Sequence, residues 1–252
     1  MGMKFKVKKS DLNQVQALRL LFLHEANLQF IRNAFHERKW SDLYAFEMDG
    51  VRVGYGGISG SERSNRDTIF EFYVLPTYRK YSREFFAELI KKSAAKYIEC
   101  QTNDKLLHNM LLEFATKIET QAILFSDHRT TDLKPENVEV RLRTATDKIF
   151  EHKVEPEGDY VILENDEIVA TGGFLTHYNF PYADLYMEVK EDHRRKGYGS
   201  YIIQEVKKYC YLAGRVPAAR CNVDNIGSRS TLLKAGMMIC GYKVSALIKV
   251  EG

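Results

Sequence analysis

The first half of the chain alternates between helical and strand-like hydrophobic patterns. Apolar residues recur every three or four positions after Ser10-Asp11, a pair suited to cap a helix (Leu12, Val15, Leu18, Phe22, Ala26). Two strand-like runs, 43–48 and 51–58, flank Asp49-Gly50, a dipeptide that strongly indicates a β-hairpin. Further strands are expected at 68–75, 97–100, 122–125 and 138–142, and helices through 85–90 and 106–114. The first half is therefore predicted to be α/β.

The second half repeats this order of elements from Asp159 onward. Asn165-Asp166 forms a turn between two strand-like runs, 160–163 and 168–174. A strand, a long helix, a strand, a short helix and a last strand are then expected (184–190, to about 215, 218–223, from 228, and 238–250). The second half is therefore predicted to have the fold of the first.

Three landmarks recur between the halves at nearly one spacing. A glycine pair, a strand valine and an arginine reappear 116 or 115 positions later (Gly56-Gly57 and Gly172-Gly173, Val74 and Val189, Arg79 and Arg194). Such a spacing is typical of an internal duplication. We predict two tandem domains of α/β (α+β, mixed-sheet) fold, 1–136 and 137–252, divided in the polar, proline-containing stretch 126–137 or just after the strand that follows it.

The composition indicates globular domains with no nucleic-acid or membrane partner. Hydrophobic residues make up 44% and charged residues 28% of the 252 residues, which is enough apolar material for a core. The net charge of +3 is too small to attract nucleic acid or anionic lipid over a long range. No apolar run reaches membrane-spanning length.

The four cysteines are expected to be buried thiols (Cys100, Cys210, Cys221, Cys240). No two form a CxxC pair or lie near histidines at metal-ligand spacing, so we predict no metal site. Sparse cysteine favours a reducing compartment, and Met1–Lys6 lacks the apolar segment of a secretion signal. We therefore expect a cytoplasmic protein. The sequence does not decide between a monomer and a homodimer.

The strongest chemical signal is the segment 189–200, VKEDHRRKGYGS, between a strand and an amphipathic helix. The helix begins near Gly197, where its unpaired N–H groups collect, and the absence of side chains at Gly197 and Gly199 leaves room for a ligand. A helix start carries partial positive charge and favours anions. Three basic side chains precede the glycines (Arg194, Arg195, Lys196). The segment therefore predicts a phosphate site.

The spacing within this segment points to one family. Ile202 stands where GxGxxG needs its third glycine, and GxxxxGK[ST] is absent, which disfavours dinucleotide and ATP sites. The pattern R-x-x-G-x-G, five residues after Val189, resembles the acyl-CoA pyrophosphate loop of the GNAT N-acetyltransferase superfamily. Asn225-Ile226-Gly227-Ser228, followed by Lys234 and Gly236, is similar to a second CoA-contacting segment of that family. The resemblance covers about 159–250.

The resemblance implies two tandem GNAT-like acyl-CoA N-acyltransferase domains, the second of which binds acetyl-CoA as co-substrate. By this resemblance, the residues that contact the cofactor in the family correspond to the following positions of this sequence (Val189, Arg194, Arg195, Lys196, Gly197, Tyr198, Gly199, Ser200, Asn225, Ser228). In the family, the strand that corresponds to Glu188 and Val189 pairs with the pantetheine arm. The base that takes a proton from the amine would then be Glu188 or Asp184, and we favour Glu188.

The chain departs from the family at one catalytic position. Leu232 stands where many members have a tyrosine that protonates the CoA thiolate. Water, Ser230 or Tyr242 could supply that proton instead. We expect an N-acetyltransferase that moves an acetyl group from acetyl-CoA to an amine of a small molecule by direct attack. A non-catalytic acyl-CoA sensor or interaction module is the alternative. The resemblance names neither the amine nor the acyl chain.

The first copy lacks the glycines of the predicted phosphate site. Ser82 and Glu84 stand where Gly197 and Gly199 stand in the second copy. A carboxylate at the phosphate position opposes CoA binding, so the first domain is predicted to be inactive. The second copy, in turn, has only a short polar segment before Asp159, in place of the helical patterns that precede Trp40.

Overall fold

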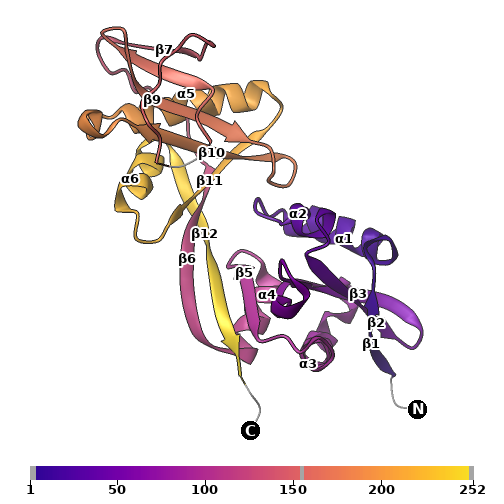
Figure 1. Ribbon diagram of the computed structural model, residues 1–252. Coiled ribbons are helices and arrows are strands. Elements are labelled where there is room, and N and C mark those ends of the chain that lie inside the picture. Colours follow the sequence, from indigo (N-terminus) through magenta and orange to yellow (C-terminus); the bar gives the residue numbers. More distant parts are fainter. Residues whose placement is uncertain (1–3, 154–155, 250–252) are drawn as a thin grey trace. The chain divides into compact units, whose positions relative to one another are not determined.

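The computed structural model describes residues 4–153 and 156–249 (Figure 1). Met1–Met3 and the expected strand end at Val250 lie outside these residues. The chain divides into two compact units, one of residues 1–121 and 242–252 and the other of residues 122–241. Within the described residues, no helix has the length and apolarity needed to span a membrane.

The first unit is a mixed sheet with helices on both faces (Figure 1). Its strands run antiparallel from β1 to β4, β5 is parallel to β4, and the end of β12 is antiparallel to β5 (β1 Phe5–Ser10, β2 Ser41–Met48, β3 Val51–Ser59, β4 Thr68–Val74, β5 Tyr97–Gln101, β12 Met237–Ile248). The helix α1 packs on one face, and α3 and α4 pack on the other (α1 Leu12–Ala26, α2 Asn33–Glu37, α3 Ser82–Ser93, α4 Lys105–Phe114). The predicted hairpin is confirmed, with Asp49 and Gly50 at φ of 48° and 86°.

The second unit repeats this order of strands. Strands β7 to β10 are antiparallel, β11 is parallel to β10, and β6 is antiparallel to β11 (β6 Ala115–Asp127, β7 Val138–Leu142, β8 Tyr160–Glu164, β9 Glu167–Leu175, β10 Tyr182–Val189, β11 Val216–Asn222). The long helix α5 (Tyr198–Leu212) buries Ile202 and Val206 against this sheet, and α6 (Ile226–Lys234) follows β11. A Cβ on Gly172 of β9 would lie 2.7 Å from Ile202, so this glycine lets the helix approach the strand closely.

The predicted duplication extends to individual hydrogen bonds. In the second unit the Lys190 N–H donates to the Val169 carbonyl at 2.9 Å, and in the first unit the Leu75 N–H donates to the Val53 carbonyl at 2.8 Å. The arginine of each copy donates from Nε to the carbonyl of the last strand valine, over 3.2 Å for Arg194–Val189 and 3.1 Å for Arg79–Val74. A 3₁₀ helix follows each strand (η2 Pro76–Tyr81, η3 Glu191–His193). In both units the chain therefore leaves the sheet with the same hydrogen bonds and through a 3₁₀ helix.

The compact units have other limits than the predicted domains 1–136 and 137–252. β6 starts at Ala115, directly after α4, and only its part from Ala122 onward belongs to the second unit. β12 starts in the second unit, and its part from Tyr242 onward belongs to the first. Each of these two strands therefore contributes residues to both units.

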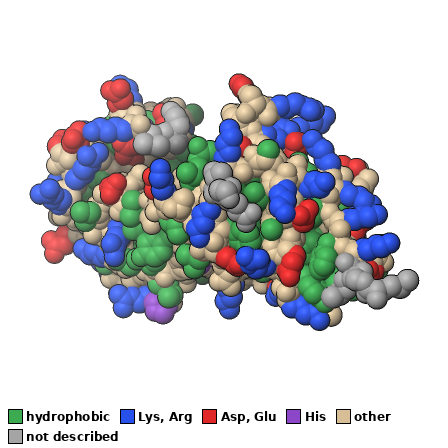
Figure 2. All heavy atoms as spheres, turned by 90° about the horizontal axis from the view of Figure 1, so that it is seen from below, with side chains coloured by type: hydrophobic (Ala, Val, Ile, Leu, Met, Phe, Trp, Pro, Cys, Tyr) green, Lys and Arg blue, Asp and Glu red, His purple; other side chains and the backbone are tan. Residues whose placement is uncertain are grey.

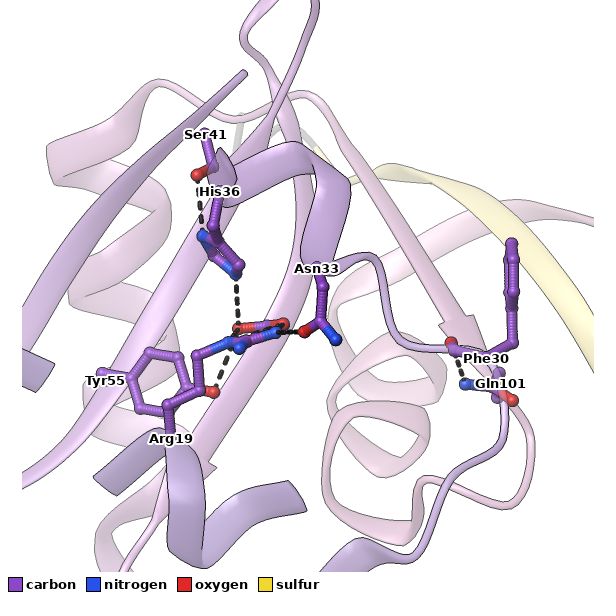
Figure 3. Close-up of polar contacts among 8 residues, drawn as sticks. Arg19, Phe30, Asn33, His36, Ser41, Tyr55 and Gln101 are labelled. Carbon is purple, nitrogen blue, oxygen red and sulfur yellow. Dashed lines mark hydrogen bonds and ion pairs between the residues drawn. The ribbon is translucent and has the colours of Figure 1, made fainter. Parts of the chain in front are cut away.

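A buried polar cluster lies between α1, α2 and β4 of the first unit (Figure 3). Glu71 accepts hydrogen bonds from Arg19, Tyr55 and His36, and His36 also contacts Ser41 at 2.8 Å. Burial alone would raise the pKa of Glu71, but the His36 hydrogen bond and the Arg19 charge lower it to about 2. The cluster therefore holds a charged carboxylate inside the first unit.

The cysteines are free thiols, and three of them are buried as predicted. Burial raises the pKa of Cys210 to about 11 and also raises the pKa of Cys100 and Cys221. Cys240 is only partly buried. The buried thiols are thus core residues with little thiolate.

Candidate functional site

A cavity of about 750 Å³ lies in the second unit, where β10 ends and α5 begins. It brings together nearly all residues predicted for the site (Glu188, Val189, Arg194, Arg195, Gly197, Tyr198, Gly199, Ser200, Asn225, Ser228). Residues that no motif had indicated also line it, among them Lys153, Pro156 and Tyr186. Lys196 is not among its lining residues. The two predicted motifs, which lie about thirty positions apart in sequence, thus face one space.

One wall of the cavity is the part of β10 that is no longer paired with β11. The parallel register of these strands covers only Tyr182 to Asp184 on β10. On its other edge, β10 stays paired with β9 as far as Val189. The backbone groups of β10 beyond Asp184 that face away from β9 are therefore placed to pair with an extended ligand.

The first turn of α5 forms the opposite end of the cavity. Gly197 is the N-cap residue at φ of 91°, and no side chain caps the N–H groups that follow it. Only glycine adopts this backbone conformation without strain. A Cβ on Gly199 would lie 3.2 Å from Thr231 and 3.5 Å from the Met187 sulfur, so a side chain there would crowd α6 and β10. The uncapped N–H groups thus face a space that both glycines keep open.

Cationic side chains surround this helix start. Arg194 and Arg195 line the cavity, and the ammonium of Lys234 lies 3.7 Å from the position of a Cβ on Gly197. Arg194 is fixed by its hydrogen bond to Val189 and lies 3.6 Å from Glu191. Positive charge beside uncapped N–H groups is the arrangement that binds phosphates.

Lys196 and Tyr198 have partners outside the cavity. The Lys196 ammonium lies 3.1 Å from Glu164 on β8, and the Tyr198 hydroxyl donates to the same carboxylate. Burial and this hydrogen bond raise the pKa of Tyr198 to about 12, and the two donors lower the pKa of Glu164. His193 also lies 3.3 Å from Glu164. Glu164, which carried no motif signal, thus anchors the loop to the sheet.

The polar residues of the second motif shape the helix start of α6. The Asn225 side chain accepts from the Ser228 N–H at 2.9 Å and so caps α6. The Ser200 hydroxyl donates to the Thr231 carbonyl at 3.1 Å and joins α5 to α6. Leu232 is 3% exposed and packs in the core of the second unit. These contacts hold the two helices beside each other at the cavity.

Glu188 lies on β10 beside Val189, and a residue outside this strand fixes its carboxylate by hydrogen bonds. Its two carboxylate oxygens accept from the backbone N–H of Lys153 at 3.1 and 3.2 Å. Lys153 belongs to the segment between β7 and β8, which has no helix in its described residues. Asp184, the other candidate base, lies 3.5 Å from His177 and does not line the cavity. Glu188 is therefore the better placed of the two carboxylates.

The corresponding position in the first unit has a different local structure. α3 follows η2 directly, and its N-cap residue Tyr81 has a φ of −107°, outside the left-handed region. Ser82 is buried, and Glu84 lies in the first turn of α3. The first unit thus replaces the glycine loop by a continuous helical path with a carboxylate at its start.

Comparisons with known proteins agree with the duplicated architecture. Residues 11–128 match the family model described as "Acetyltransferase (GNAT) domain", and residues 123–237 match that of the "Acetyltransferase (GNAT) family". No match was found among curated proteins.

Solved structures share the fold along nearly the whole chain. An acetyltransferase of the GNAT family from Colwellia psychrerythraea has a TM-score of 0.74 at 14% identity, covering 97% of this chain and 100% of that one. A GCN5-related N-acetyltransferase from Sphaerobacter thermophilus has a TM-score of 0.58 at 13% identity, covering 98% and 97%. A tandem GNAT protein from the clavulanic acid biosynthesis pathway has a TM-score of 0.58 at 11% identity, covering 99% and 100%. At these identities the likeness concerns the fold.

Proposed function

Because the chain belongs to the GNAT acetyltransferase superfamily, with two such domains in tandem, we propose that its second unit transfers an acetyl group from acetyl-CoA to an amine of a small molecule. The main support for the proposal is the cavity, which is lined by the glycine-containing start of α5, by the basic side chains beside it and by Glu188. The free thiols fit a cytoplasmic location. On the face drawn in Figure 2, acidic and basic side chains are interspersed, which favours a small acceptor over a polyanion.

The cavity offers separate places for the parts of acetyl-CoA. The N–H groups from Gly197 to Ser200, with Arg194, Arg195 and Lys234, would hold the diphosphate. The edge of β10 near Val189 would pair with the pantetheine arm. The bound thioester supplies the acetyl group. An arm that follows β10 would bring this group beside Glu188.

Glu188 would act as the base in this arrangement. It would take a proton from the amine as the nitrogen attacks, directly or through water, while the Lys153 N–H fixes the carboxylate. Backbone N–H groups of β10 would stabilise charge on the carbonyl oxygen. Of the two hydroxyl candidates for the thiolate proton, Ser230 lines the cavity and Tyr242 does not. Ser230 is therefore the proposed acid.

The test combines CoA binding with turnover. We expect calorimetry to detect one CoA site in the full chain and a thiol assay to detect CoA release that depends on an added amine. The sensor alternative, which Leu232 at the tyrosine position favours, predicts tight CoA binding without amine-dependent thiol release. Absence of CoA binding would contradict both readings.

A further inference from the structure

Lys153 is an amine of the chain itself at the proposed acetyl-transfer site. It lines the same cavity as Glu188, and its backbone N–H is bonded to the Glu188 carboxylate. Its side chain is 62% exposed, and its ammonium lies 3.1 Å from Glu191. The backbone contact fixes the root of this side chain near the carboxylate, while the exposed chain is free to change rotamer.

We propose that Lys153 is a self-acetylation site of this protein, an inference that rests on the proposed function of the cavity. An amine on a residue that lines the cavity needs no diffusion from solution to meet the thioester, so its effective concentration is above that of a free amine. The same carboxylate that would accept the proton of a bound substrate lies next to the backbone of Lys153. The chain thus offers an internal acceptor to its own site.

The chemical step balances without any further reactant. The neutral Lys153 nitrogen attacks the thioester carbonyl, forming a C–N bond as the C–S bond breaks. The proton of the nitrogen passes to Glu188, and the departing thiolate takes a proton from Ser230 or water. Solvent then carries the Glu188 proton back to that donor, which restores both groups. The products are acetylated Lys153 and free CoA.

Other lysines near the loop lack this combination of features. Lys196 is paired with Glu164, and neither it nor Lys190 lines the cavity. Lys234 lines the cavity, but its ammonium lies beside Gly197, at the proposed diphosphate end. Selective modification of Lys153 is therefore expected over these neighbours.

Glu191 restrains the reaction of Lys153. The Lys153 ammonium lies 3.1 Å from the Glu191 carboxylate, and this contact holds the side chain at a residue that does not line the cavity. The contact also lowers the pKa of Glu191, chiefly through the Lys153 hydrogen bond. Replacing Glu191 by glutamine removes the charge of this partner and is therefore expected to release the Lys153 side chain for movement into the cavity.

Mass spectrometry of the full-length protein incubated with acetyl-CoA tests the proposal. We expect acetylation at Lys153 to be at least ~10-fold faster than in Gly197→Glu, which should not bind CoA but keeps background chemistry. The rate per molecule should not depend on protein concentration. Lys190 and Lys196 should stay at background, and Glu191→Gln should react about two- to fivefold faster, as expected for loss of an exposed ion pair.

A second measurement uses the wild-type chain alone. Excess CoA should slow acetylation of Lys153 while leaving the background at exposed lysines unchanged, because CoA competes only in the cavity. If CoA binds and added amines are acetylated, but Lys153 reacts at background rate, the inference is overturned and the proposed function stands. If CoA does not bind, both are overturned.

Discussion

Arg19 holds Glu71 through two guanidinium nitrogens inside the first unit. Nη2 lies 2.9 Å from one carboxylate oxygen and Nε lies 3.1 Å from the other, and the two side chains are 9% and 2% exposed. Tyr55 and His36 complete the shell of donors around Glu71. The pair joins α1 to β4, so the stability of the first unit should depend on the charge of this carboxylate.

Acid should destabilise the first unit through Glu71. Its pKa is about 2 in the folded chain, below the ordinary value of 4.5, so its stabilising effect is present above pH 4.5 and disappears as the pH falls toward 2. The loss should reach about 2–3 kcal/mol. Urea unfolding between pH 2 and 6 measures it. An unchanged pH slope in Glu71→Gln would contradict the assignment.

Removing only one partner of this pair should be worse than removing both. Glu71→Gln leaves the Arg19 charge buried without a counter-charge, and we expect it to lower the free energy of unfolding by about 3–5 kcal/mol. Arg19→Met combined with Glu71→Met buries no charge and should cost less. Urea titration of the two variants at neutral pH decides the order. Equal losses would mean that packing, not charge, dominates.

A carboxylate at Gly197 should abolish CoA binding. Gly197→Glu places negative charge at the uncapped start of α5, and we expect CoA affinity to fall by about 100-fold or more. Gly197→Gln is the matched control, since glutamine has the size of glutamate and bears the same backbone strain but adds no charge. Calorimetry with both variants separates charge from backbone strain. Equal affinity of Gly197→Glu and the wild type would remove the diphosphate from this position.

Glu188→Gln should slow the reaction without weakening CoA binding. Glutamine keeps the size of the side chain and an acceptor for the Lys153 N–H, but is not a base, so kcat is expected to fall by about 100-fold. Asp184→Asn provides the comparison, because Asp184 lies outside the cavity lining and should matter much less. Steady-state kinetics with the best amine of the panel gives both values. A larger loss in Asp184→Asn would reverse the choice of base.

Ser230→Ala should reduce kcat only moderately. CoA thiolate is a good leaving group, so loss of its proton donor is expected to cost about tenfold or less, with water as the substitute. Ser228→Ala serves as the control, because Ser228 lines the same cavity and donates its backbone N–H, which alanine keeps, to the cap residue Asn225. If both variants retain full kcat, water is the donor in the wild type.

Local turn chemistry and hydrophobic periods predicted much of the fold. The Asn165-Asp166 turn joins β8 and β9 with both residues at positive φ, as short hairpins require. The start of α5 near Gly197 follows from the apolar period of the helix and the glycines before it. In contrast, the polar stretch 116–121 gives no strand signal, and it becomes part of β6 only through its position in the sheet.

For the candidate site, too, the sequence predicted the residues with local signals and missed those that depend on the fold. Residues in the two motifs could be predicted because glycine spacing and helix starts are local features. Glu164 and Lys153 could not be predicted, because both lie far from the motifs in sequence. Glu164 comes near the loop through the pairing of β8 in the sheet, and Lys153 comes near Glu188 through the loop between β7 and β8. A single carboxylate or lysine in a polar stretch is usually a solvated side chain. Only the folded arrangement distinguishes these two from their neighbours.

Because the end of β12 belongs to the first unit, the two units cannot complete their folding in the order in which their synthesis begins. β5 pairs along one edge with residues 243–247, which leave the ribosome after the whole of the second unit. The second unit, formed by the continuous stretch 122–241, is complete before them. The first unit is thus begun before the second but closed after it, and until then its sheet presents an open edge to chaperones and to other chains.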